Sequence, residues 1–592
     1  MPTNDSHAPI ERPLPSGANA AAFGSDVAAE ALRALDIPYI ALNPGASYRG
    51  LHDSLVNYLG NAGPQMLLCL HEESAVAIAQ GYAKVTGKAM AAAVHSNVGL
   101  MHATMAIFNA WCDRMPVLVI GATGPVDAAE RRPWIDWIHT ARDQGALVRN
   151  YTKWDDQPAS PAAAREAILR AAWIAQTAPM GPVYINLDAG MQEAALAEPI
   201  PAIDAARFMP AAASVPAAES IAAAAALLKA AKHPVMLIGR TSRSLDAWNA
   251  RVALAEALGA LVITDLKVGA SFPTDHHRHV GAPSVLVPDA AGLAALGAAD
   301  VILSLDWVDL AGTLKAAKAP SPGAKVVQVS IDYQMHNGWS MDYQGLPPVD
   351  LHLAAAPDAA VPLLVAALGK TPDHVSVRGV PEETSLPDGP LTVEHLARAL
   401  REAVGEKPVS LTHLPLSWNG AWWPFRHPLD YLGSDGGGGI GGGPGISVGA
   451  ALALKGSGRL PIAICGDGDF LMGVTALWTA AHYKIPLLVV VANNRSFFND
   501  ELHQERVARM RNRPVENRWI GQRISEPDID LAAMARAQGA LGFGPIETTG
   551  DLGPAFAQAI AAVEAGRVAV VDVRVATGYA PSMTAVMTRK SD

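Results

Sequence analysis

Short apolar runs alternate with alanine-rich helical stretches from about residue 23 almost to the end of the chain. The runs 37–44, 89–96 and 116–123 have the length and hydrophobicity of buried strands, and segment 73–87 between two of them has helical spacing. Strands that alternate with helices of this length predict βαβ units and parallel sheets.

The chain divides into three blocks of this kind. Its 592 residues are too many for one core, and two proline-rich stretches, 196–215 and roughly 371–390, are typical of linkers. We therefore expect an α/β protein of three consecutive Rossmann-like domains with parallel sheets. The expected bounds are a flexible tail over 1–22 and domains over 23–195, 215–370 and 390–580. Further strands are expected at 181–188, 233–239, 260–266, 299–305, 324–332, 409–415, 460–468, 486–494 and 567–575.

Composition excludes several classes of protein. The formal net charge of −11, from 45 basic and 56 acidic residues, argues against nucleic-acid binding. No stretch of about 18 uncharged apolar residues occurs, so an ordinary membrane span is not expected. Three separated cysteines in apolar segments (Cys69, Cys112 and Cys465) and a polar N-terminus predict a reduced, cytoplasmic protein.

Polar residues follow two strands of the last block. GDGDF at 466–470 comes after one strand and opens a helical run, and Asn494 follows the next strand, 494 − 467 = 27 positions after Asp467. A carboxylate and an amide oxygen at neighbouring strand ends can bind one hard cation, and Mg²⁺ prefers such ligands and shares them with phosphate. Gly466 and Gly468 would let a diphosphate approach the backbone. GDG alone is also typical of a tight turn, but the second strand end favours a metal–diphosphate site.

A glycine run, SDGGGGIGGGPGISVGAA, occupies 434–451. By composition it could be a flexible linker. Because it leads directly into an apolar helix, we interpret it as a cofactor cradle.

The pairing of GDG with NN at this spacing resembles the signature of thiamine-diphosphate-dependent enzymes of the pyruvate decarboxylase and acetohydroxyacid synthase type. The resemblance spans roughly 23–580 and implies a pyrimidine-binding, a central and a diphosphate-binding domain, in that order. It implies that Asp467 and Asn494 bind Mg²⁺ through their side chains and that Ser496 binds it through its backbone carbonyl. The remaining cofactor-binding residues it implies are Gly439, Ile440, Gly466, Gly468 and Asp469, with Ile440 holding thiamine in its bent form.

The segment HEESAVAIAQGYAKVTGK at 71–88 resembles the family motif that carries the activating acid. Thiamine becomes a nucleophile only when its thiazolium C2 loses a proton, which requires an acid at the far nitrogen of the aminopyrimidine. The resemblance assigns this role to Glu72, nine residues before Gly81, and leaves Glu73 as its solvent-facing neighbour. A lone glutamate here could also serve as a charge at a helix N-terminus.

Two histidines are candidates for proton transfer to the substrate. The loop at 94–111 places His95 where many relatives have Ser or Thr, and it resembles the loop of benzoylformate decarboxylases. FPTDHHRHVG at 272–281 places His276 at the second catalytic histidine of those enzymes. Either histidine could instead be structural. Ala46 replaces the serine that meets the substrate carboxylate there, and Ser47 is expected to point elsewhere, which argues against a strict benzoylformate decarboxylase.

Two further segments allow two interpretations each. Segment 495–525 carries seven arginines and no lysine. This composition is typical of a salt-bridged surface helix, and it would also suit a lid over an acidic or CoA-type substrate. The three tryptophans of SWNGAWWPF at 417–425 could line the pocket or pack between domains.

These features together predict a thiamine-diphosphate- and Mg²⁺-dependent carbon–carbon lyase. It would decarboxylate a 2-oxo acid or cleave a 2-hydroxyacyl substrate. The alternatives are an acetolactate-synthase-like carboligase, although 299–310 lacks the arginine motif for FAD, and a non-catalytic cofactor-binding regulator. In the family the cofactor lies between the first domain of one chain and the last domain of another, which implies a homodimer or homotetramer.

Overall fold

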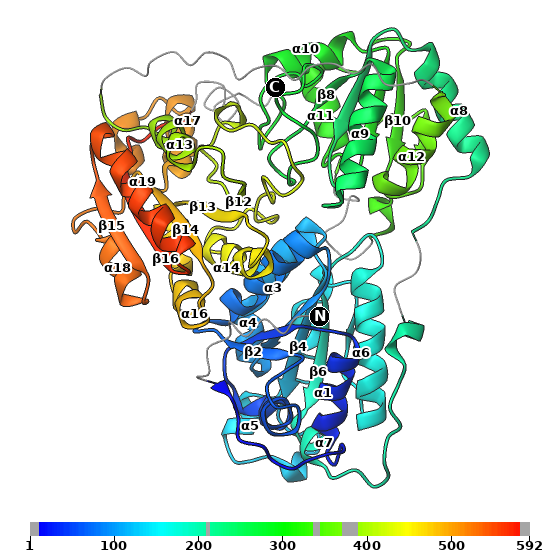
Figure 1. Ribbon diagram of the computed structural model, residues 1–592, viewed down its shortest axis with the longest axis vertical. Coiled ribbons are helices and arrows are strands. Elements are labelled where there is room, and N and C mark those ends of the chain that lie inside the picture. Colours follow the sequence, from blue (N-terminus) through cyan, green and yellow to red (C-terminus); the bar gives the residue numbers. More distant parts are fainter. Residues whose placement is uncertain (1–10, 209–212, 336–343, 370–388, 580–592) are drawn as a thin grey trace.

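The computed structural model describes residues 11–208, 213–335, 344–369 and 389–579. Three separate sheets, each built of parallel strands and flanked by helices, follow one another along the chain (Figure 1). The predicted fold class, three consecutive α/β domains with parallel sheets, is confirmed. Most of the second expected linker, 371–390, lies outside the described residues.

The first sheet has the strand order β2-β1-β3-β4-β6-β5. Its central strands β3 and β4 are buried along their whole length, as expected of parallel strands covered on both faces. The strands are β1 (Tyr39–Leu42), β2 (Gln65–Leu68), β3 (Met90–Val94), β4 (Val117–Thr123), β5 (Asp155–Asp156) and β6 (Val183–Asp188). The helices of this domain are α1 (Gly24–Ala34), α2 (Arg49–Asp53), α3 (Glu72–Thr86), α4 (Ser96–Asp113), α5 (Ile135–Ile138), α6 (Pro161–Gln176) and α7 (Ala189–Glu193).

The second sheet has the order β11-β10-β9-β7-β8. Its strands are β7 (Pro234–Ile238), β8 (Leu261–Ile263), β9 (Val301–Leu305), β10 (Lys325–Val329) and β11 (Leu351–Leu353). The helices are α8 (Ala218–Ala230), α9 (Leu245–Leu258), α10 (Ala290–Ala298), α11 (Leu310–Ala317) and α12 (Pro357–Leu368).

The third sheet has the order β12-β13-β14-β16-β15. Its strands are β12 (Val409–His413), β13 (Leu460–Gly466), β14 (Leu487–Asn493), β15 (Leu541–Ile546) and β16 (Val568–Arg574). The helices are α13 (Val393–Val404), α14 (Gly443–Leu454), α15 (Asp467–Gly473), α16 (Ala476–His482), α17 (Phe498–Met510), α18 (Leu531–Ala537) and α19 (Thr549–Glu564).

Every strand expected from the sequence is present, with ends that differ by a few residues. The four strands that the sequence analysis missed are β2, β5, β11 and β15, and each lies at the edge of its sheet. These four strands are only partly buried, so they lack the continuous apolar run by which the other strands were recognised.

Helices α3 and α14 join the first and last domains by direct backbone contact. A Cβ atom on Gly81 would lie 1.9 Å from the carbonyl oxygen of Ile446, and one on Gly449 would lie 1.9 Å from that of Ile78. Only glycine allows this approach. The glycine of the GYAKVTG motif is therefore required for packing, and one continuous apolar core runs through both domains.

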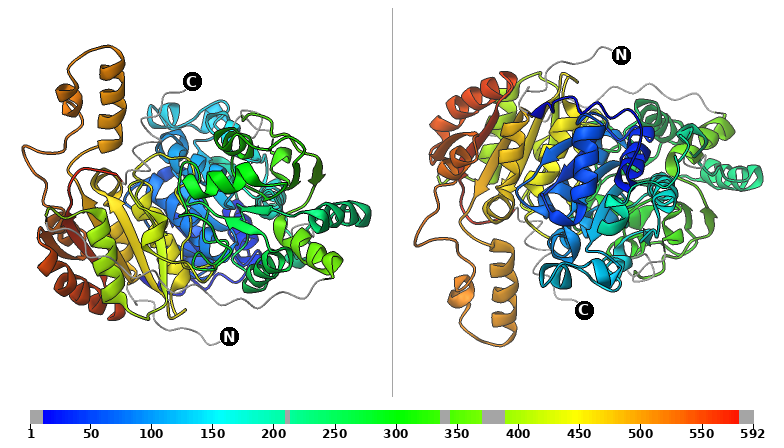
Figure 2. Two further views of the ribbon diagram at one scale, coloured as in Figure 1. Left: turned by 90° about the horizontal axis from the view of Figure 1, so that it is seen from above. Right: turned by 90° about the horizontal axis from the view of Figure 1, so that it is seen from below.

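Four further observations complete the fold. The segment after Glu11 is held in place, since the Glu11 carboxylate accepts hydrogen bonds from His482 and Tyr483. Helix α17 and the turn that follows it project from the last domain (Figure 2). No helix in the described part of the chain is both long and apolar enough to cross a membrane. Cys69 and Cys465 are buried free thiols, and Cys112 is a half-buried one.

Candidate active site

Two neighbouring strand ends bring oxygen ligands together in the last domain. Strands β13 and β14 are paired in parallel, so Asp467 and Asn494 follow them at the same edge of the sheet. The backbone N–H of Ser496 donates to Asp467 Oδ2 at 3.1 Å and to Asn494 Oδ1 at 2.9 Å, which holds the two oxygens side by side. Ligand sites of α/β proteins form at this end of a parallel sheet.

The charge of Asp467 is not balanced by the protein. The residue is buried, and burial raises the pKa of its carboxyl group to about 6. No cationic side chain of the described chain forms an ion pair with it. A buried carboxylate without a counter-ion is costly, and a bound cation removes that cost. The oxygen donors and the uncompensated charge therefore fit a Mg²⁺ ion.

The second aspartate of GDGDF fixes the glycine run. Asp469 Oδ1 accepts hydrogen bonds from the N–H groups of Gly441 at 2.7 Å and Gly443 at 3.2 Å, and Oδ2 forms an ion pair with His413 at 3.2 Å. Burial works to raise the pKa of Asp469, but His413 and the two N–H groups outweigh it and lower the pKa below its usual value. Asp469 thus orders the cradle from behind, while the exposed side chain of Ile440 stands out from it.

A cavity of about 800 Å³ contains all of these elements, which is within the range of small-molecule sites. The eight residues predicted from the last block all line it, namely Gly439, Ile440, Gly466, Asp467, Gly468, Asp469, Asn494 and Ser496. Cys112 and Asp113 of the first domain and Lys267 of the central domain line its other walls.

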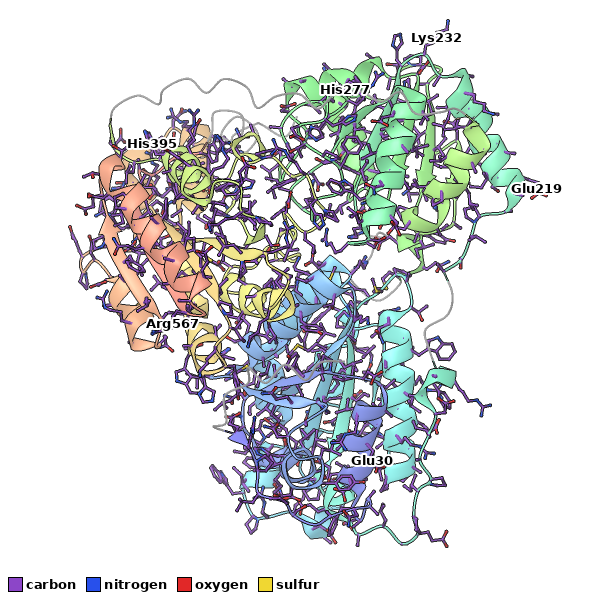
Figure 3. All side chains as sticks on the ribbon, viewed as in Figure 1. Glu30, Glu219, Lys232, His277, His395 and Arg567 are labelled. Carbon is purple, nitrogen blue, oxygen red and sulfur yellow. The ribbon has the colours of Figure 1, made fainter. Side chains whose placement is uncertain are left out.

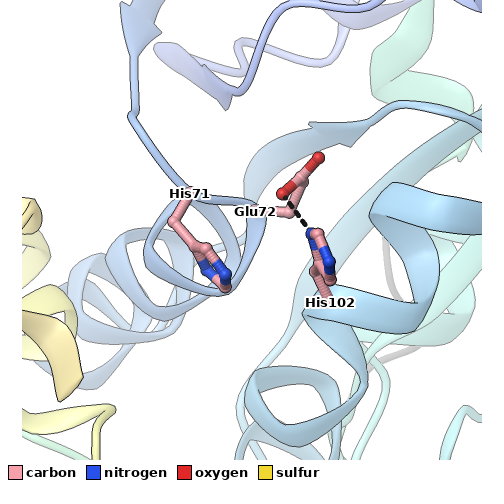
Figure 4. Close-up of side chains that lie close together, drawn as sticks. All are labelled: His71, Glu72 and His102. Atoms are coloured by element: carbon pink, nitrogen blue, oxygen red, sulfur yellow. Dashed lines mark hydrogen bonds and ion pairs between the residues drawn. The ribbon is translucent and has the colours of Figure 1, made fainter.

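Glu72 lies outside this cavity, in a second group of side chains at the start of α3 (Figure 4). It is buried, and its Oε2 forms a hydrogen bond with His102 Nδ1 at 3.1 Å. Its neighbour Glu73 was expected to face solvent, but it does not. Glu73 is half-buried toward the glycine run of the same chain, and burial together with the charge of Asp469 raises its pKa.

His95, at the N-terminus of α4, belongs to the same group. Its Nδ1 accepts hydrogen bonds from the hydroxyl group of Ser47 at 2.9 Å and from its backbone N–H at 3.3 Å. The proton of the neutral ring therefore lies on Nε2. Burial first, and then the nearby His139, lower the pKa of His95 below its usual value. Its ring contacts that of His139 edge to face, with centroids 4.7 Å apart.

Three of these contacts could not be read from the sequence. Ser47, expected to point elsewhere, is buried and orients His95. His102 and His139 reach Glu72 and His95 from other elements, and neither stands in a recognisable motif. The only available signal was the number of histidines in the first domain.

His276 is not brought together with the other candidates in one chain. It is buried in the central domain, where its Nε2 forms a hydrogen bond with Glu256 at 3.2 Å, next to the labelled His277 (Figure 3). It does not line the cavity of the last domain.

The arginine-rich segment is partly neutralised by its own acids. Glu505 pairs with Arg509 and Arg518, and the buried Glu501 pairs with Arg518 and Arg523. Of the arginine-rich segment, only its start lines the cavity, from Ser496 to Asp500, and no arginine of the segment does so.

The tryptophans at 417–425 belong to packing. Trp418 and Trp423 are buried in a core cluster that joins the central and last domains, and neither lines the cavity.

Comparison with known proteins agrees with this geometry. Three models of thiamine pyrophosphate enzymes match in order: the N-terminal TPP-binding domain over 23–148, the central domain over 221–344 and the C-terminal TPP-binding domain over 416–573. The chain belongs to the thiamine pyrophosphate enzyme family. Relatives within it include decarboxylases and acetolactate synthases.

The chain is 27% identical to a benzoylformate decarboxylase of Pseudomonas aeruginosa over 461 residues, which cover 73% of this chain and 79% of that protein. It is 24% identical to a probable acetolactate synthase large subunit of Methanocaldococcus jannaschii over 538 residues, covering 87% and 86%. The crystal structure of a benzoylformate decarboxylase from Polynucleobacter necessarius superimposes with a TM-score of 0.78, covering 95% of this chain and all of that one. At 21% identity this likeness concerns the fold.

Proposed function

We propose that the protein is a carbon–carbon lyase that depends on thiamine diphosphate and Mg²⁺ and decarboxylates a 2-oxo acid or cleaves a 2-hydroxyacyl substrate. The observation that carries the proposal is the joining of Asp467 and Asn494 through one N–H group of Ser496 inside the cavity. The names of the decarboxylase relatives support the reaction class.

Each residue group has a separate task in this proposal. Asp467, Asn494 and the backbone carbonyl of Ser496 would hold Mg²⁺, and the glycines around Asp467 would let the diphosphate approach. When bound, the cofactor supplies a carbon nucleophile that attacks the substrate carbonyl and then accepts its electrons. Glu72 would exchange a proton with the aminopyrimidine ring, which controls the formation of that nucleophile.

His95 would move protons at the substrate. Its lowered pKa keeps the ring neutral near pH 7, and Nε2–H is the end left free by Ser47. That N–H can donate to the oxygen that gains charge when the carbonyl is attacked, and it can recover the proton when product leaves.

The active site needs two copies of the chain in this account. Glu72 and His95 lie outside the cavity that holds Asp467 in their own chain. We propose that they close the cavity of a second copy, so the smallest active unit is a homodimer and a homotetramer is a dimer of such dimers. In that assembly His276 would have to reach the active site from the central domain. We propose a catalytic role for it on the resemblance alone.

The direct test is turnover of a panel of 2-oxo acids and 2-hydroxyacyl-CoA esters, with and without thiamine diphosphate and Mg²⁺. We expect release of CO₂ or aldehyde that requires both additions. A second candidate, an acetolactate-synthase-like carboligase, is favoured by relatives of that name at 24–25% identity. Formation of acetolactate from pyruvate as the only substrate would support the carboligase and overturn the lyase.

A further inference from the structure

The carboxylate of Glu72 is held on its solvent side by one residue. His102, on α4, places its Nδ1 3.1 Å from Glu72 Oε2. The side chain of His102 is 59% exposed, whereas that of Glu72 is 9% exposed, so an exposed imidazole bonds a buried carboxylate (Figure 4). Because Nδ1–H donates to an anionic oxygen, this is one of the stronger kinds of hydrogen bond.

The other oxygen of Glu72 occupies a gap in the same helix. A Cβ atom on Gly99 would lie 3.0 Å from Glu72 Oε1, so the absence of a side chain at Gly99 makes room for that oxygen. One oxygen is thus bound to His102, and the second is free to meet a ligand.

His102 is itself fixed by a neighbour. Its ring stacks on that of His71, with centroids 5.2 Å apart and planes at 17°. His71 in turn accepts a hydrogen bond from the N–H of Glu73 at the start of α3. The contacts of His102 therefore tie α4 to the residue before Glu72.

We propose that His102 is a positioning residue for Glu72, which holds one carboxylate oxygen so that the other meets the aminopyrimidine. The inference rests on the proposed function of Glu72. His102 needs no contact with substrate or cofactor in this role. Its removal should leave cofactor binding unchanged and slow only the proton transfer that Glu72 performs.

The test is the rate of hydrogen–deuterium exchange at C2 of bound thiamine diphosphate, measured by quenched-flow NMR in the intact enzyme. We expect His102→Ala to slow exchange by about 10- to 100-fold, the effect of losing a hydrogen bond to a charged group. His102→Asn should restore most of the rate, because an Asn amide can donate from nearly the position of Nδ1. Thr104→Ala, on the same helix, is the matched control and should leave the rate unchanged.

Glu72→Gln is measured in parallel, together with the thiamine diphosphate affinity and melting temperature of each variant. An unchanged exchange rate in Glu72→Gln would overturn the role of Glu72 itself. A slow Glu72→Gln with a normal His102→Ala would overturn only the positioning role. A slow His102→Ala that Asn does not restore would overturn it too, because lost packing would be the cause. Transition metals are kept out of the assay buffers, because ligand atoms of His71, Glu72 and His102 lie within 4.8 Å of one another and could bind such an ion.

Discussion

The two halves of the proposed site are built in different ways. The half in the last domain uses strand ends and backbone N–H groups, which align Asp467 with Asn494 and fix the glycine run through Asp469. The half in the first domain uses side chains from separate elements, with imidazoles around Glu72 and His95. Backbone geometry suits an anchor that must stay fixed, whereas imidazoles suit proton transfer. A lesion in the half built by the last domain should abolish cofactor binding, and a lesion in the half built by the first domain should slow turnover of an enzyme that still binds.

The largest effect on cofactor binding is expected at Asp467. Asp467→Ala should give a folded protein whose affinity for thiamine diphosphate in excess Mg²⁺ falls by at least about 100-fold, because the cation loses its charged ligand. Calorimetry of the apoprotein measures the change, and Asp246→Asn, on the exposed face of α9, serves as the control. Wild-type affinity in Asp467→Ala would show that Asp467 does not bind the metal that holds thiamine diphosphate.

Replacement of His95 should lower turnover but not cofactor affinity, the opposite of the Asp467 variant. His95→Ala should lower kcat by about 10²- to 10⁴-fold and leave cofactor affinity nearly unchanged, since general acid–base catalysis is lost and the anchor is intact. Steady-state kinetics and calorimetry on the same sample give both values. A variant that loses stability but keeps its turnover per folded molecule would make His95 structural.

His139 should change the pH dependence more than the maximal rate. Burial and His139 lower the pKa of His95, so wild-type activity that needs the neutral ring should persist to lower pH than an ordinary histidine allows. His139→Asn should raise the pKa of His95 by removing a neighbouring positive charge. The acid limb of the kcat profile should then move to higher pH. An unmoved limb would show that another group controls it.

The smallest effect is expected in the arginine-rich segment. Arg509 already pairs with Glu505, whereas Arg506 has no ion pair within the described residues. Arg506→Ala should raise the KM of an anionic substrate by about 2- to 5-fold, as expected of an exposed charge contact, and added salt should mimic the change. Arg509→Ala is the matched control and should leave KM unchanged. Equal KM values in the two variants would show that Arg506 does not contact the substrate and that α17 is a surface helix.

The half-site in the last domain was predictable because its residues directly follow two strands that are adjacent in the sequence. Parallel strands end at the same edge of a sheet, so Asp467 and Asn494 had to meet once both strands were recognised. The inner strands were recognised for the same reason, from continuous buried runs. Edge strands such as β15 were missed because they are half-exposed and carry no such run.

The imidazole contacts of the first domain could not be predicted. His102 lies 30 positions from Glu72 and His139 lies 139 − 95 = 44 positions from His95. No strand or helix repeat relates these distances to a contact. The contact of Ser47 with His95 was not predicted either, because it depends on the short helical turn over Ala46–Tyr48, which directs the hydroxyl group toward the imidazole.

The central claim is that Glu72 of one copy and Asp467 of another complete one active site. The most direct measurement mixes Glu72→Gln and Asp467→Ala chains by co-expression and isolates the doubly tagged dimer. Each variant alone should be inactive. The doubly tagged dimer should recover about half of the turnover of a wild-type dimer, because one of its two sites is intact. If the purified mixed dimer binds thiamine diphosphate but remains inactive, the two half-sites do not act across copies and the account is contradicted.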